Sequence, residues 1–120
     1  MLTANIGNNI GLLMMVVFPI AMYGFLLIDK LIRRLYETFY DEWVRVGKPS
    51  GLLYFPPDSK NAESMISLQI NIFSWFFKTP QWIKDDALSL SHLRKIRLSL
   101  ALGNILMLLA VIAFVFSLRQ

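Results

Sequence analysis

Few residues in this sequence have the type and spacing that enzyme chemistry needs. Asp85 and Asp86 are adjacent, so on a helix their carboxylates project about 100° apart and do not face each other as a general acid–base pair would. We therefore predict that they are helix N-terminal acids and partners of nearby cations. The only histidine is His92 and there is no cysteine, which leaves no recognisable set of metal ligands. We expect His92 at the membrane interface beside Arg94, although a proton-carrying role stays open.

Motifs for nucleotide or acyl chemistry are also missing. Lys48 follows a lone glycine, without the spacing of a phosphate-binding loop. There is no nucleophile elbow and no glycine-rich dinucleotide fingerprint. We predict a protein that is not an enzyme and that has no catalytic residue, cofactor, metal or nucleic-acid partner.

Two long uncharged runs dominate the sequence instead, at 10–28 and 98–118. Each is close to the roughly 20 helical residues that cross a bilayer. The composition is 56% hydrophobic, which is more than an ordinary soluble domain carries. A buried hairpin in a soluble core is disfavoured, because the loop could not cover two uniformly apolar helices. A pump or channel usually needs an ionisable residue inside a span, and neither run has one.

The first run does not resemble a cleaved signal peptide, because nothing before Ile10 is cationic and "FPIAMYG" lacks a small-residue cleavage pattern. We therefore expect it to remain attached and to span the membrane. Pro19 lies in the middle of the run, where it should remove one backbone hydrogen bond and kink the helix.

The positions of the cations predict the orientation. One cation, Arg119, lies beyond the outer ends of the two runs, whereas six flank their inner ends: Lys30, Arg33, Arg34, Arg94, Lys95 and Arg97. The positive-inside rule places such residues in the cytoplasm, at the lipid headgroups. We predict an all-α membrane protein of the bacterial inner membrane, with these parts: a translocated N-terminus (1–9), transmembrane helices 10–28 and 98–118, a mostly helical cytoplasmic loop (29–97) and a translocated C-terminus (119–120).

The first part of the loop has apolar residues at helical spacing. The helix should continue from the first span without a break and stop at Gly47, followed by Lys48 and Pro49. Its aromatic face could lie on lipid, but packing against the rest of the loop or a partner is favoured. We predict a loop platform made of Phe39, Tyr40, Trp43, Trp75 and Phe76.

The segment "ESMISLQINIFSWFF" has two competing periods. Apolar and polar residues alternate from 66 to 72 as in a strand, but a lone strand without a partner is unstable. We therefore predict a helix for 65–73. The following "SWFFKTPQW" suits the headgroup layer, and a small packed core between loop helices is the alternative. Thr79 and Pro80 should be the N-cap and first residue of the next helix.

Small residues mark places where helices can pack closely. Gly7 and Gly11 form a G-x-x-x-G pattern, and Ser99 and Gly103 a related pair with Asn104 beside it. Such residues let helix backbones approach, and Asn104 can hydrogen-bond across helices. The second span should therefore meet another helix, from this chain or from a neighbour.

Several of these features together resemble the universal stress protein B family. They are the span, the aromatic helix with "WVRVGKPSG", the "SWFF" segment, "DD", the basic "HLRKIR" and a final span with "LALGN". The resemblance covers roughly residues 30–105. It implies a small two-span inner-membrane protein with a cytoplasmic middle and a role in stress or adaptation, without a known reaction.

The most specific function that we predict is a non-enzymatic accessory or structural subunit of a larger inner-membrane protein complex. It should bind integral-membrane partners through the second span and the loop, and also contact lipid. The alternatives are a free-standing stress protein, which could be a homo-oligomer, and a pore or transport component, which the uncharged spans disfavour.

Overall fold

The structure, a computed structural model, describes residues 2–57, 59 and 62–119, and the side chains among them from Ile10 onward. These residues form helices and connecting segments, without a strand. The prediction of an all-α chain is confirmed, and so is the helix predicted for 65–73. The helices are α1 (Leu2–Thr38), α2 (Tyr40–Arg45), α3 (Ala62–Phe77), α4 (Gln81–Lys84) and α5 (Ala87–Leu118).

Two of the helices, α1 and α5, are long and apolar enough to cross a bilayer. In the most apolar stretch of α1, 17% of the residues are buried, and in that of α5 only 11%. The core helix of a soluble protein would have most of its apolar residues covered by the rest of the chain. The two candidate membrane spans that the sequence predicts are therefore present.

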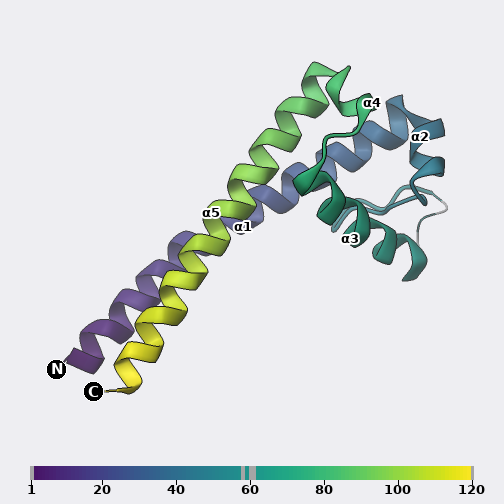
Figure 1. Cartoon of the computed structure of the whole chain (residues 1–120). Helices are drawn as coiled ribbons and strands as arrows, with labels where there is room; N and C mark the ends of the chain where they lie inside the picture. Colours follow the sequence, from purple (N-terminus) through teal and green to yellow (C-terminus); the bar gives the residue numbers. More distant parts are fainter. Residues whose placement is uncertain (1, 58, 60–61, 120) are drawn as a thin grey trace. The chain divides into compact units, whose positions relative to one another are not determined.

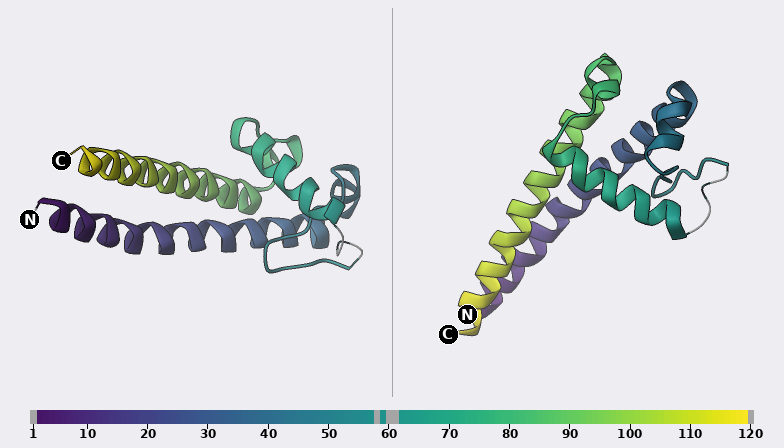
Figure 2. Two further views of the ribbon diagram at one scale, coloured as in Figure 1. Left: turned by 90° about the horizontal axis from the view of Figure 1, so that it is seen from below. Right: turned by 45° about the vertical axis from the view of Figure 1, so that its right-hand side comes forward.

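The chain divides into two compact units, which we describe separately. The helix pair combines Met1–Gly24 with Leu98–Gln120, and the helical module is Phe25–Arg97. In the helix pair, the first part of α1 and the last part of α5 run side by side in opposite directions, and both ends of the chain lie at the same end of the pair (Figures 1 and 2). α1 continues through Pro19 as one helix, so the proline does not break it.

Small residues bring the two helices of the pair together. Ser99 is 6% exposed, and its hydroxyl donates a hydrogen bond of 2.6 Å to the carbonyl of Ile20. A Cβ added to Gly24 would lie 2.8 Å from Oγ of Ser99 and 3.3 Å from its Cβ. Ser99 therefore packs on a glycine of the same chain, and the first span is the neighbour that meets it.

The helical module has its own core, made of large apolar side chains from all five helices. Its fully buried members include Leu31, Leu35, Trp43, Ile83 and Leu93. α1 does not run unbroken to Gly47 as predicted, because Phe39 leaves the helical conformation, with φ −124° and ψ 54°, and α2 starts after it. Phe39 contacts Trp82, with ring centroids 5.2 Å apart, so a packing contact from elsewhere in the chain accompanies the break.

The end of α2 is closed by residues in the left-handed region. Gly47 has a φ of 98°, as predicted for a helix stop, and Lys48 follows with a φ of 52°. The backbone N–H of Lys48 donates to the carbonyl of Trp43 at 2.8 Å, as at other left-handed helix ends. The indole of Trp43 donates to the carbonyl of Pro49 at 2.9 Å, which holds the chain over the tryptophan after the turn.

The start of α4 differs from the prediction by one residue. Pro80 is the N-cap, with φ −68° and ψ 157°, and the helix begins at Gln81. The hydroxyl of Thr79 does not cap it, and instead accepts a hydrogen bond of 2.8 Å from Arg97. The prediction of Thr79 as N-cap was wrong because Arg97, distant in sequence, uses this hydroxyl.

The close approach at Gly24 generates a first prediction. Gly24→Ala should weaken the helix pair and lower its melting temperature in mild detergent, measured by far-UV circular dichroism, because the new methyl group overlaps Ser99. Gly11→Ala and Gly103→Ala are matched controls, since a Cβ there meets nothing within 4 Å among the described residues. They should be neutral or stabilise the helix by up to about 1 kcal/mol. Equal effects at all three glycines would contradict the packing described here.

Candidate functional site

Asp86 joins the two long helices inside the helical module. Its carboxylate accepts from Nε and Nη2 of Arg34 at 2.8 and 2.9 Å, a bidentate ion pair with α1. It also accepts from the backbone N–H and hydroxyl of Ser89, at 3.2 and 2.5 Å, and so caps the N-terminus of α5. Arg34 first, helped by Ser89, holds the pKa of Asp86 well below its ordinary value. For Asp86 this confirms the prediction of a helix N-terminal acid paired with a cation, whereas the same prediction for Asp85 was wrong.

Asp85 has a different place from its neighbour. It follows α4 as the C-cap residue and accepts a hydrogen bond of 2.9 Å from the amide of Gln81 at the surface. The two carboxylates thus have separate partners, so they do not act as a pair.

A third carboxylate, that of Asp29, holds the connector between α2 and α3. It accepts from the backbone N–H of Leu52 at 2.5 Å and from that of Leu53 at 3.0 and 3.3 Å. Gly51 lies so close to this carboxylate and to the carbonyl of Tyr54 that a Cβ would overlap both. This contact could not be recognised from the sequence, because the partners of Asp29 are backbone groups, which no residue pattern identifies.

A shallow groove of about 210 Å³ lies between α1 and the start of α5, inside the module. Its lining combines cations with one carboxylate and one imidazole, from Lys30, Arg33, Arg34, Glu37, Thr38, Leu88 and His92. Arg34 is committed to Asp86, and the guanidinium of Arg33 lies 4.6 Å from the centre of the Tyr54 ring. The positive charge of the groove is therefore partly neutralised, and Glu37 is the one carboxylate among the lining residues.

The pKa of His92 is lowered in this groove. Burial contributes most, followed by the charges of Lys30, Lys95 and Arg34, against a smaller opposite effect of Asp86. Its Nδ1 is buried and has no hydrogen-bond partner among the described residues. The surroundings of His92 therefore favour the neutral form of its imidazole.

The residues predicted as a loop platform divide between core and surface. Trp43 and Trp75 are 0% and 3% exposed, inside the module. Phe39 and Phe76 are half-buried and Tyr40 is 48% exposed. The tryptophans of "SWFFKTPQW" thus follow the packed-core alternative, since the rings of Trp75 and Trp82 lie 5.8 Å apart. Of the face formed by Phe39, Tyr40 and Trp43, the chain therefore buries Trp43, covers Phe39 in part and leaves Tyr40 exposed.

The six cations that predict the orientation differ in their exposure and in their partners. Four are exposed: Lys30, Arg33, Arg94 and Lys95. Arg34 pairs with Asp86, and Arg97 donates two hydrogen bonds to the carbonyl of Trp75, at 3.0 and 2.5 Å. Arg97 is the last charged residue before the apolar run of α5, so the C-terminal end of α3 is fastened to that boundary.

The outer surface of α3 carries a row of exposed apolar side chains. We define the α3 stripe as Ile66, Ile70, Phe73 and Phe77, which are 55%, 64%, 70% and 68% exposed. Their spacing of four, three and four residues places them on one face. The helical spacing of these apolar residues can be recognised in the sequence. Which face of the helix is buried, however, depends on contacts with distant residues.

The predicted packing residues of the second span have different surroundings. Ser99 is buried on Gly24, whereas Asn104 is exposed and its amide donates only to the carbonyl of Leu100 in the same helix, at 2.7 Å. A Cβ on Gly103 would meet nothing within 4 Å among the described residues, and the same holds for Gly11. The side-chain surroundings of Gly7 lie outside the described residues.

Within the described residues, no three His, Asp or Glu side chains gather in a way that could hold a metal ion. The polar groups with defined partners cap helices, close turns and fasten one helix to another.

Comparison of the chain with protein-family models, curated proteins and solved structures finds no match.

The ion pair and helix cap at Asp86 generate a second prediction. Asp86→Asn keeps a good N-cap residue but removes the charge that Arg34 needs, whereas Asp86→Ala removes both and should cost about 1 kcal/mol more. Denaturant unfolding in detergent can be followed by tryptophan fluorescence, because all three tryptophans lie in the helical module. Asp85→Asn is the matched control and should stay near the parent protein.

The dependence of stability on pH below neutrality separates the contribution of the Arg34–Asp86 ion pair from that of the helix cap. Because the folded-state pKa of Asp86 is lowered, its ionic contribution is fully present above the unfolded pKa of about 3.9 and is lost as the pH falls below it. Asp86→Asn should therefore be destabilised most at pH 5–7, and its difference from the parent protein should begin to shrink as the pH falls below about 4 and continue to shrink towards the lower folded-state pKa of Asp86. A difference that is constant over this range would show that the ion pair contributes nothing.

Proposed function

We propose that this chain is a non-enzymatic accessory or structural subunit of a larger protein complex in the bacterial inner membrane. The observation that carries the proposal is the side of α5 that bears Gly103 and Asn104. Asn104 is exposed within an apolar run, and its amide donates to the carbonyl of Leu100 in its own helix. Among the described residues, nothing lies within 4 Å of a Cβ built on the neighbouring Gly103. This combination suits a second helix.

The energetic argument follows from the environment of a span. Lipid chains offer no hydrogen-bond partner to the rest of the Asn104 amide, whereas a polar group on a neighbouring helix does. Such an interhelical bond contributes about 0.6–2 kcal/mol in membranes. Gly103 adds van der Waals contact, because the absence of a side chain lets the neighbour approach. We infer that an integral-membrane partner covers this side.

The cytoplasmic location of the helical module is part of the same proposal. It rests on the six cations at the inner ends of the runs and the single Arg119 beyond them. Both termini would then be periplasmic. Lipid headgroups would contact the exposed cations Lys30 and Lys95.

A free-standing stress protein of the universal stress protein B type is the second candidate. One observation favours it: residues in the motifs that carry the resemblance connect or end the helices of the helical module. Gly47 closes α2, Asp86 joins α1 to α5, and Arg97 of "HLRKIR" binds α3. The motifs that carry the resemblance therefore have structural roles in this chain. In this case the pure chain would act alone or as a homo-oligomer.

The orientation is tested by cysteine labelling, which is clean because the chain has no cysteine of its own. A membrane-impermeant maleimide applied to intact spheroplasts should label Thr3→Cys and Gln120→Cys but not Glu63→Cys. Glu63 is an exposed position of α3, so it should label after the membrane is permeabilised. Labelling of Glu63→Cys in intact spheroplasts, without labelling of the termini, would show the opposite orientation.

The partner surface is tested by photo-crosslinking from the second span in cells. Met107 lies four residues after Gly103 and three after Asn104, so it shares their side, whereas Leu109 projects about 140° away from Asn104. A photoreactive residue at Met107 should give a defined larger adduct, and one at Leu109 should give little. Gly103→Leu should abolish the adduct, and Asn104→Leu should reduce it by about 3–30-fold in affinity, which corresponds to 0.6–2 kcal/mol.

Substitution of the polar groups elsewhere discriminates between a subunit and an enzyme. Asp85→Asn and His92→Ala should leave the adduct intact. If the adduct contains only this chain, the homo-oligomeric stress protein is favoured. If Gly103→Leu keeps the adduct while His92→Ala abolishes a measurable activity of the host, the accessory-subunit proposal fails.

A further inference from the structure

The α3 stripe points away from the core of the module, and the structure explains why. On the opposite side of α3, Leu68 and Trp75 are each 3% exposed. Ser67 and Asn71 both donate to the carbonyl of Val46, each at 2.9 Å. These contacts fix the rotation of the helix, so the stripe cannot turn inward. We propose that the α3 stripe is a membrane anchor that inserts into the headgroup layer of the bilayer in which the two spans lie.

The hydrogen bonds of Arg97 favour lipid as the occupant. Arg97 holds the carbonyl of Trp75 and the hydroxyl of Thr79. It immediately precedes the apolar run 98–118, and cations at the ends of spans lie in the headgroup region. Residues 75–79 are therefore held at the level of the headgroups. The proposal rests on the membrane location proposed above, but not on any protein partner.

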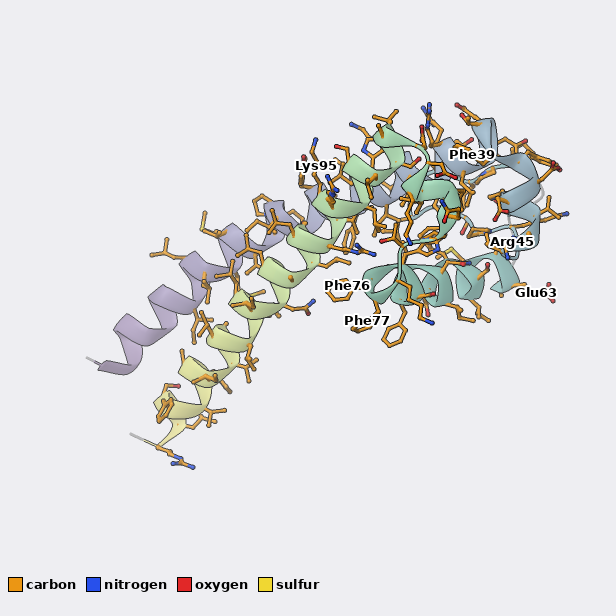
Figure 3. The ribbon with its side chains drawn as sticks, turned by 45° about the horizontal axis from the view of Figure 1, so that its top comes forward. Phe39, Arg45, Glu63, Phe76, Phe77 and Lys95 are labelled. Atoms are coloured by element: carbon orange, nitrogen blue, oxygen red, sulfur yellow. The ribbon has the colours of Figure 1, made fainter. Side chains whose placement is uncertain are left out.

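The side chains at this end of α3 have the chemistry of an interfacial anchor. Phe77 contacts Phe73 and Phe76, with ring centroids 5.3 and 5.2 Å apart. Lys78 follows and is exposed, so its ammonium can reach lipid phosphates while the rings enter the acyl boundary. Glu63, the one charged residue within α3, lies at the opposite end of the helix from Phe77 (Figure 3).

A second copy of the chain fits the stripe less well. A standard protein interface uses about 20–30 residues on each side. The stripe has four side chains along about 17 Å of one helix, which is enough for an interfacial helix but small for a dimer.

The depth of the stripe can be measured with spin labels on the full chain in vesicles of phosphatidylethanolamine and phosphatidylglycerol. Single cysteines carry the label at Ile70 or Phe73 in the stripe, at the exposed Asp41 of α2, and at the exposed Leu108 of α5. Collisions with oxygen report lipid, and collisions with a water-soluble nickel chelate report water. Tryptophan fluorescence verifies that the module is folded in each variant.

If the stripe is an anchor, labels at Ile70 and Phe73 collide more with oxygen than with the chelate, and the label at Asp41 does the opposite. Phe77→Glu should reverse the ratio at Ile70 in the folded protein. Labels at Ile70 that collide freely with the chelate would overturn the proposal, and so would labels protected from both reagents, which would indicate a protein on the stripe.

The label at Leu108 distinguishes the two possible failures. If Leu108 reports lipid and the stripe reports water, the anchor is wrong and the two-span protein stands. If Leu108 also reports water, the membrane location itself is wrong.

Discussion

The helical module depends on one carboxylate that has several partners. Asp86 accepts hydrogen bonds from Arg34 on α1 and from Ser89 on α5, so it fixes where α5 begins and which side of α1 it meets. A bidentate, charge-assisted contact is more directional than apolar packing, so it can select one arrangement among several that would bury similar area.

Many polar side chains of the module form hydrogen bonds with other groups of the module. Asp29 closes a turn, Arg97 fastens α3, and Ser67 and Asn71 fix the rotation of α3. What remains at the surface is the α3 stripe, exposed charged side chains of both signs, such as Lys30 and Glu37, and the sides of the spans. The apolar part of this surface suits contact with lipids and neighbouring helices, which agrees with the proposed role.

The spans, the helical nature of the loop, the stop at Gly47 and the helix cap formed by Asp86 were predictable because each depends on residues close together in sequence, whereas the identity of the cation that pairs with Asp86, Arg34, was not. The helix break at Phe39, the partner of Thr79 and the contact between Ser99 and Gly24 were not. Each of these involves a group distant in the chain, and local periodicity is the same whether or not that group is there. The exposed face of α3 was also not predictable. The sequence of α3 shows that the helix has an apolar face, but it does not show whether distant residues pack on that face.

The two charged residues that bound the apolar runs are both immobilised. Asp29 is held by the backbone of Leu52 and Leu53, and Arg97 by the carbonyl of Trp75. A free side chain at the end of a span can stretch towards the headgroups when the bilayer thickens, but these two cannot without giving up their bonds. The 21 residues of 98–118 extend about 31 Å as a helix. In the proposed membrane location, mismatch at these two residues would be relieved by tilt of the helices or deformation of the lipid, and the exposed cations such as Lys30 and Lys95 would be the side chains that follow the headgroups.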